Sequence, residues 1–119
     1  MKTLQLIDFI SVESNLTKDV DLFYLDIPLQ TSGLWLQDSS VPSTFNGVDT
    51  TQYEVYIRNK DKAIAVDNIG YFKNWVETNE KCELPDGTTF RLTIDNNWDF
   101  LEKDSENYYV FTSTLTLVV

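Results

Sequence analysis

The sequence predicts an α+β domain of two layers, a mostly antiparallel sheet of four to five strands with two helices on one face. Apolar and polar side chains alternate with a period of two in Thr51–Arg58, as in a strand with one buried face. After Asn59 the apolar residues recur at the helical steps of four, three and four: Ala65, Ile69, Phe72 and Val76. A strand that feeds directly into an amphipathic helix is the nucleus of such a domain, and the expected order is α-β-β-β-α-β-β.

The N-terminal part contributes the first three elements. Lys2–Ser14 carries apolar residues at helical spacing and predicts a helix. Asp21–Ile27 predicts a strand that ends at Pro28, whose missing N–H cannot continue a ladder. Ser32–Gln37 predicts a second short strand, in which Gly33 is a bulge or a turn residue.

Residues 38–50 are rich in Ser, Thr, Pro, Asn, Gly and Asp, which predicts a mobile loop. Phe45 lies in the middle of this loop. An aromatic side chain there either folds back onto the core or anchors a partner, and the first alternative is favoured.

The second helix has signals at both ends. Asn59 or Asp61 is expected as its N-cap, and the helix is expected to end near Asn79 or Lys81. Gly70 lies inside it and costs about 1 kcal/mol relative to Ala. We expect this glycine to allow close packing of the helix on the sheet.

The C-terminal part predicts an antiparallel pair of strands. A tight turn is expected at residues 84–87, a strand at 88–95, a polar acidic connection at 96–106 and a long strand at 107–119. Polar residues line one face of several strands, so helices are expected to cover only the other face. The uncovered face is then free for solvent or for a neighbouring subunit.

The composition indicates one domain, residues 1–119, without a disulfide or a membrane partner. The formal net charge is -10, and the only cysteine is Cys82. Phosphate binding needs an excess of Lys and Arg, so this charge argues against binding to nucleic acid. We find no segment with the features of a secretory signal and no apolar run long enough to cross a bilayer.

The chain has no histidine, which excludes Ser-His-Asp and Cys-His nucleophile systems and every histidine metal site. Lys81 precedes Cys82 and would lower its pKa, but without a base to pair with, a structural thiol is favoured. The four glycines form no phosphate loop. We therefore predict neither enzymatic activity nor a cofactor.

One acidic segment approaches the pattern of a calcium loop. Asp95, Asn97, Asp99 and Glu106 occupy its positions 1, 3, 5 and 12. Position 6 requires glycine and is Phe100, and the flanking segments predict strands where the motif has helices. A solvated acidic hairpin loop is therefore favoured, and no metal is expected.

Two large aromatic residues in the same segment, Trp98 and Phe100, lie among carboxylates. They either tuck under the sheet as a lid or serve as interface anchors, because aromatic residues carry much of the binding energy at protein contacts. Trp35 is open to the same two alternatives.

The C-terminal two-thirds of the chain shows a characteristic succession of segments: the strand Tyr53–Lys60, the helix after it, the turn Leu84–Gly87, the strand Phe90–Thr93, the acidic linker with Leu101–Asp104 and the final strand Tyr108–Thr116. In this succession the chain resembles the tail-terminator proteins of long-tailed bacteriophages, often labelled minor capsid proteins.

The resemblance implies a homo-hexameric ring in the virion, assembled in the host cytoplasm. Such a ring caps the tail tube and joins the head connector, while DNA passes through without specific binding. Candidate interface residues lie in the 38–50 loop, in the 95–106 loop and on the polar strand faces: Phe45, Gln52, Glu54, Arg58, Arg91, Trp98, Asp99 and Phe100.

An alternative function is an acidic module that mimics DNA and occupies the basic groove of another protein. The net charge of -10 favours it. A mimic needs its carboxylates along one face, however, and here lysines lie between them, so the structural role in a phage is the favoured hypothesis. A small hydrolase or transferase lacks the residues it would need.

Overall fold

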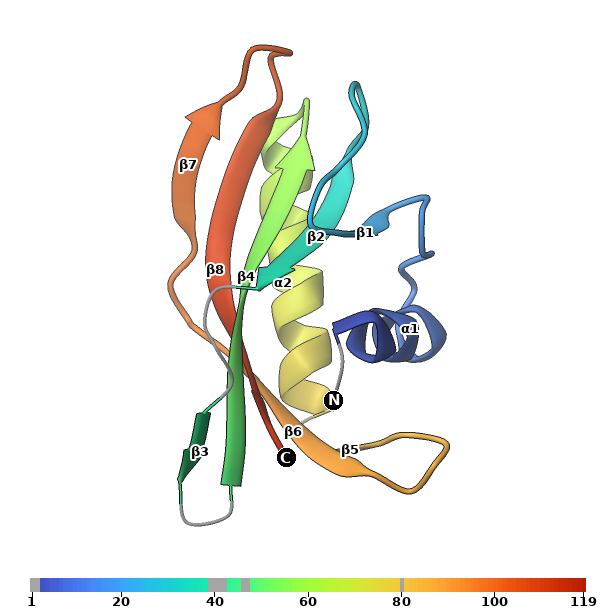
Figure 1. Ribbon diagram of the computed structural model, residues 1–119. Helices are drawn as coiled ribbons and strands as arrows, with labels where there is room; N and C mark the ends of the chain where they lie inside the picture. The colour runs from blue at the N-terminus through green and yellow to red at the C-terminus, as the bar shows by residue number, and fades with distance from the viewer. Residues whose placement is uncertain (1–2, 39–42, 46–47, 80) are drawn as a thin grey trace.

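The computed structural model describes residues 3–38, 43–45, 48–79 and 81–119, and these contain two helices and eight strands (Figure 1). In chain order the elements are α1 (Thr3–Glu13), β1 (Leu22–Tyr24), β2 (Gly33–Asp38), β3 (Ser43–Phe45), β4 (Val48–Asn59), α2 (Lys62–Thr78), β5 (Lys81–Glu83), β6 (Thr89–Ile94), β7 (Asp99–Lys103) and β8 (Tyr109–Val118).

The strands form one mixed sheet in the order β1-β2-β4-β8-β6-β5, and it curls toward the helices (Figure 1). Two further strands each pair with a stretch of a long strand that its other neighbour leaves free. Strand β3 pairs with residues 48–50 of β4, whereas β2 pairs with residues 53–58. Strand β7 pairs with residues 109–112 of β8, whereas β6 pairs with residues 115–118. Only β1 and β2 are parallel among the described pairs. The α+β class is confirmed, but the expected four to five strands are too few. Three of the extra strands have only three to five residues, so neighbouring strands and not their own patterns define them.

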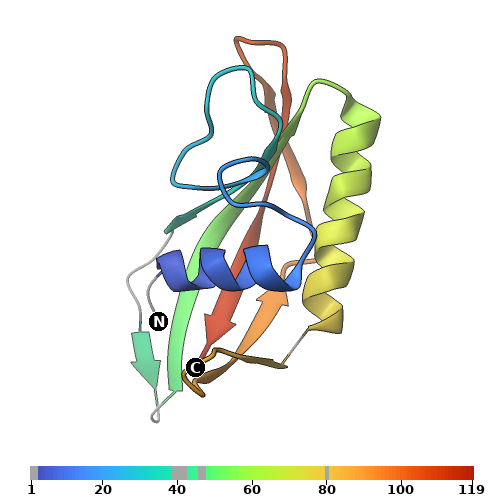
Figure 2. The same ribbon diagram turned by 90° about the vertical axis from the view of Figure 1, so that its right-hand side faces the viewer.

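Both helices lie on the same face of the sheet, as predicted (Figure 2). The carboxylate of Asp61 caps α2 by accepting from the backbone N–H groups of Ala63 at 2.9 Å and Ile64 at 3.3 Å. The helix ends at Thr78 with Asn79 as its C-cap, within the predicted limits. Its expected core positions are buried, with Ile69 partly so: Ala65, Ile69, Phe72 and Val76.

Helix α1 lies across the sheet near β1 and buries Leu6, Ile7 and Ile10 (Figure 2). The ring of Phe9 meets Phe90 of β6 edge-on, with centroids 5.0 Å apart. This contact joins the first helix to the far side of the sheet. Neither described helix has the length and apolar character that a bilayer span requires.

The two strand faces are sorted as the period of two predicts. Tyr53, Val55 and Ile57 of β4 face the helices and are buried. Their partners on β8 are Leu115, Ser113 and Phe111. Ser113 interrupts the apolar row because its hydroxyl donates to the carbonyl of Asn97 at 2.9 Å, which fixes the connection between β6 and β7.

The glycines differ from expectation. Gly70 lies on the exposed side of α2, and a Cβ built on it meets no atom within 4 Å. Its expected packing on the sheet is therefore wrong. The close approach of two backbone segments occurs at Gly33 instead. A Cβ built on Gly33 would lie 2.9 Å from the carbonyl oxygen of Asp21 in the neighbouring segment.

Three predicted segments need correction. The first strand ends at Tyr24 and not at Pro28, because Leu25 adopts a positive φ of 69°. Part of the 38–50 loop is a hairpin, with β3 paired to residues 48–50, while 39–42 and 46–47 lie outside the described residues. Its mobility stays a prediction. The 96–106 connection contains β7, which pairs with β8 around a bulge at Leu101.

The turn at residues 84–87 is confirmed. Gly87 adopts a positive φ of 91°, and its N–H donates to the carbonyl of Leu84 at 2.9 Å. The turn joins β5 to β6. It therefore creates an edge hairpin that the expected element order did not contain.

Candidate interaction surface

The face of the sheet turned away from both helices is here called the outer face. Its side chains form rows across the strands, because register places residues of β2, β4 and β8 opposite one another. The rows are Trp35, Tyr56 and Thr112; Gln37, Glu54 and Thr114; and Gln52, Thr116 and Thr93. This surface is largely neutral and hydroxyl-rich, in a chain whose net charge is -10.

An aromatic pair lies at the centre of the outer face. The rings of Trp35 and Tyr56 stack with centroids 4.7 Å apart and planes 11° from parallel. The hydroxyl of Tyr56 donates to Oε2 of Glu54 at 2.5 Å. Burial, together with this carboxylate, raises the pKa of Tyr56 to about 12. Trp35 is thus held rigidly and only partly covered, as an interface anchor would be.

Arg58 lies on this face of β4, but its predicted exposure is wrong. Its side chain is only 4% exposed. The Nη2 atom donates to Oε1 of Glu106 at 2.5 Å, and Nε lies 2.8 Å from Oδ2 of Asp104 without the alignment of a hydrogen bond. Its guanidinium carbon lies 4.1 Å from the centre of the Tyr108 ring.

This cluster closes one end of the outer face. Glu106 also accepts from the backbone N–H of Gln30 at 3.1 Å, so it ties the segment after β1 to the turn before β8. The hydrogen bonds from Arg58 and Gln30 lower the pKa of Glu106. A segment folded over the strand buries Arg58, which the period of two in β4 cannot reveal.

A polar groove of about 630 Å³ lies beside the rows, where the β6–β7 connection runs along β8. It is lined by Glu54, Asp95, Asn96, Asn97, Trp98, Asp99 and Thr112–Thr114. Oδ1 of Asp95 accepts from the N–H of Asn97 at 3.0 Å. Within the described part of the chain, no lysine or arginine forms an ion pair with the three groove carboxylates.

Trp98, just before β7, and Phe100, within β7, differ in their surroundings. Trp98 packs against the core, and its indole nitrogen is buried without a hydrogen-bond partner among the described residues, which agrees with the lid alternative. Phe100 remains 50% exposed and contacts the rings of Tyr109 and Phe111. Leu101 next to it is 54% exposed. Phe100 therefore remains a candidate anchor.

The other predicted interface residues are dispersed. Gln52 and Arg91 are exposed on the outer face, Glu54 is half-buried, and Asp99 is exposed in the groove. The side chain of Phe45 lies outside the described residues, although its backbone pairs with Val48. The structure thus brings Glu54 and Asp99 together at the groove, which Trp98 also lines, and it removes the buried Arg58 from the surface set.

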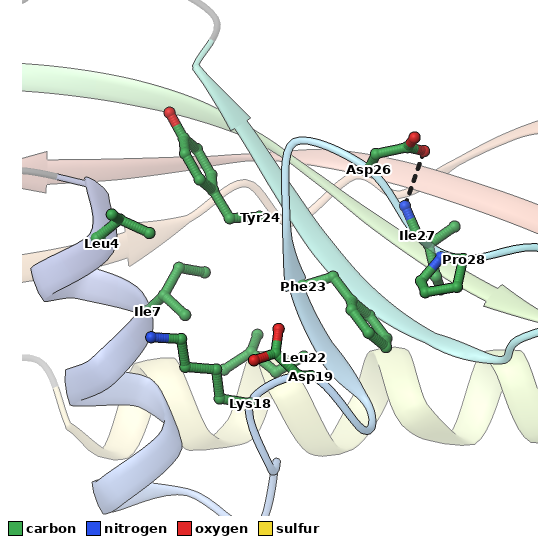
Figure 3. Close-up of a pocket in the computed structure, with 10 residues that line it drawn as sticks. All are labelled: Leu4, Ile7, Lys18, Asp19, Leu22, Phe23, Tyr24, Asp26, Ile27 and Pro28. Carbon is green, nitrogen blue, oxygen red and sulfur yellow. Dashed lines mark hydrogen bonds between the residues drawn. The ribbon is translucent and has the colours of Figure 1, made fainter.

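Two further hollows lie on the helical side. One of about 320 Å³ lies between α1 and β1 (Figure 3), with apolar walls that include Leu4, Ile7 and Phe23. Its one cation, Lys18, is paired with Asp8 at 2.9 Å. The other, of about 660 Å³, lies along α2 and is lined mainly by amides and aromatic rings.

Cys82 is buried, and its pKa differs from expectation. Burial and the nearby charge of Glu13 raise it, where Lys81 was expected to lower it. Its thiol donates to the carbonyl of Asn79 at 2.9 Å. In the described ranges no three Asp, Glu or Cys side chains are arranged to hold a metal, and Glu106 of the calcium-like pattern is bound to Arg58.

Comparison with protein-family models and with curated proteins gives no match to this chain.

Proposed function

We propose that this chain is a structural protein that assembles with copies of itself into a ring at the end of a phage tail tube. The observation that carries the proposal is the outer face. It is left uncovered by the helices, is rich in hydroxyl groups, and carries the stacked Trp35–Tyr56 pair. Such a surface suits contact with another protein better than it suits catalysis.

Charge supports the same role. A ring that DNA traverses works best with walls that repel phosphate, and a net charge of -10 provides this repulsion. The family resemblance of the sequence supplies the hexameric count, the tube and the head connector as partners. The proposal includes no turnover and no bound cofactor.

The test is direct observation of assembly. Purified protein, alone and with polymerising tail-tube protein, is examined by native mass spectrometry and negative-stain electron microscopy. We expect closed rings and tubes that stop growing with one ring on a single end. Tubes of unchanged length with no particle at their ends would reject the proposal.

A second candidate is the acidic inhibitor module. The polar groove favours it, because Glu54, Asp95 and Asp99 have no cation partner within the described residues. In that case the protein would remain monomeric and displace DNA from a basic protein. A competition assay with a labelled duplex distinguishes this result from ring formation.

A further inference from the structure

At one end of the molecule the formal charges of two neighbouring segments cancel. At this end the β4–α2 junction lies beside the β7–β8 hairpin (Figure 1). Residues 58–62 carry three Lys/Arg and one Asp, and residues 102–106 carry one Lys and three Asp/Glu, so together they are neutral. The whole net charge of -10 therefore lies on the remaining surface.

Most carboxylates at this end are already engaged. Asp104 and Glu106 surround Arg58, and Asp61 caps α2. Only Glu102 among them is exposed without such a contact. Three exposed lysines lack an ion pair anywhere in the described ranges, and we name them the lysine end: Lys60, Lys62 and Lys103.

Aromatic rings hold these lysines in place. The ammonium of Lys60 lies 5.3 Å from the centre of the Tyr108 ring, that of Lys62 lies 5.5 Å from Phe100, and that of Lys103 lies 5.1 Å from Tyr109. Ammonium groups ordered in this way lose less side-chain entropy when they dock. The lysine end thus presents three partly ordered ammonium groups at a neutral end of an acidic protein.

We propose that the lysine end docks into the polar groove of a second copy of this chain. The groove supplies Glu54, Asp95 and Asp99, none of them paired to a cation in the described part of its own chain. The contact is between two different surfaces, so it propagates head-to-tail and closes a ring when the rotation permits. This inference rests on the proposed self-assembly and assigns its contact.

Complementary charge favours a second copy over nucleic acid. A phosphate backbone that approached the lysine end would also meet the repulsion of the remaining -10 surface. The same acidic surface attracts the lysine end of a neighbour. The electrostatic contribution to the contact should weaken with salt, because a Debye length is about 10 Å at 0.1 M.

The test compares two triple variants that change the net charge equally. Lys60→Glu/Lys62→Glu/Lys103→Glu alters the lysine end, and Lys18→Glu/Lys73→Glu/Lys81→Glu alters lysines elsewhere. Sedimentation velocity from about 50 mM to about 500 mM salt measures self-association. We expect roughly tenfold or greater weakening in the first variant only. A glutamate at position 62 also suits the N-terminus of α2, so the fold should persist by circular dichroism.

A charge exchange identifies the groove as the partner. Asp95→Lys/Asp99→Lys should also fail to self-associate, and mixing it with the lysine-end variant should restore assembly, because each then offers a surface complementary to the other. Absence of restoration would overturn the proposal. So would undiminished assembly of the lysine-end variant, or a wild type that stays monomeric.

Nucleic acid is a separate outcome. If labelled single-stranded DNA binds the wild type and the lysine-end variant loses that binding without losing self-association, the surface belongs to nucleic acid and the inference is wrong. Rings that form through the lysine end but never cap a tube would reject the proposed function alone. Tubes capped equally well by the lysine-end variant would reject this contact alone.

Discussion

The guanidinium of Arg58 lies over the ring of Tyr108, 4.1 Å from its centre, and this contact joins β4 to the turn before β8. The carboxylates of Asp104 and Glu106 lie beside this guanidinium and supply the opposite charge. Its Nη1 atom donates to the backbone carbonyls of Pro28 at 3.4 Å and Thr31 at 3.5 Å. One side chain therefore connects the segment after β1, the strand β4 and the turn before β8.

Replacing Arg58 should destabilise the fold strongly. The Arg58→Met variant leaves Asp104 and Glu106 partly buried without a counter-ion, and breaking a buried pair costs about 3–5 kcal/mol. Urea unfolding followed by circular dichroism measures the loss. The exposed Arg91→Met change is the matched control and should shift the free energy of unfolding by about 0.5 kcal/mol or less. Equal effects of the two variants would contradict the buried cluster.

Stability should fall in acid because of the same cluster. Burial opposes ionisation of Asp104, but the backbone N–H groups of Tyr108 and Glu106, with Arg58, outweigh it and lower its pKa. The pKa of Glu106 is lowered by Arg58 and Gln30. Groups with a depressed folded pKa stabilise the fold above their unfolded values, about 4, and lose that contribution as pH falls through the folded values.

Urea unfolding from pH 7 downward tests this expectation. The wild type should lose stability progressively below about pH 4. The Asp104→Asn variant should begin less stable and show a shallower loss, because one of the two titrating groups is gone. An unchanged slope in that variant would show that other carboxylates determine the acid response.

The two glycines should respond oppositely to alanine. Gly70→Ala adds a methyl group to open space in a helix and should stabilise by about 1 kcal/mol. Gly33→Ala brings a methyl group to 2.9 Å from the carbonyl oxygen of Asp21 and should destabilise by about 1–3 kcal/mol. Thermal unfolding of the two variants beside the wild type measures both signs, and a stabilising Gly33→Ala would contradict the close contact.

Trp35 should matter to assembly as well as to the stability of the monomer. Trp35→Ala removes the ring stacked on Tyr56, which costs the monomer about 0.5–1.5 kcal/mol beyond the lost buried area. Self-association should weaken roughly tenfold or more, as for an interface anchor. Sedimentation velocity measures it, with Tyr71→Ala, an aromatic that is 76% exposed on α2, as control. Equal loss in both variants would place the contact elsewhere.

Because local pattern is enough to define long amphipathic elements, the sequence predicted both helices, the long strand β4 and the strand pair β6–β8, and it named Asp61 as one of two candidates for the N-cap of α2. It did not predict β3, β5 and β7. Strands β3 and β7 pair because β4 and β8 extend beyond β2 and β6 and present free edges, and β5 pairs because the turn at residues 84–87 folds it back onto β6. Those edges and that return of the chain are tertiary properties.

For the candidate site, the sequence by itself determined which residue types are present: no histidine, a net charge of -10 and a polar outer face on β4. Only the tertiary structure decided which of those polar residues are accessible. Alternation assigns a side chain to a face of a strand, but it carries no information on what later folds over that face. Arg58 and Gln52 share one face of β4, yet the turns at Gln30 and Glu106 bury the first and leave the second exposed.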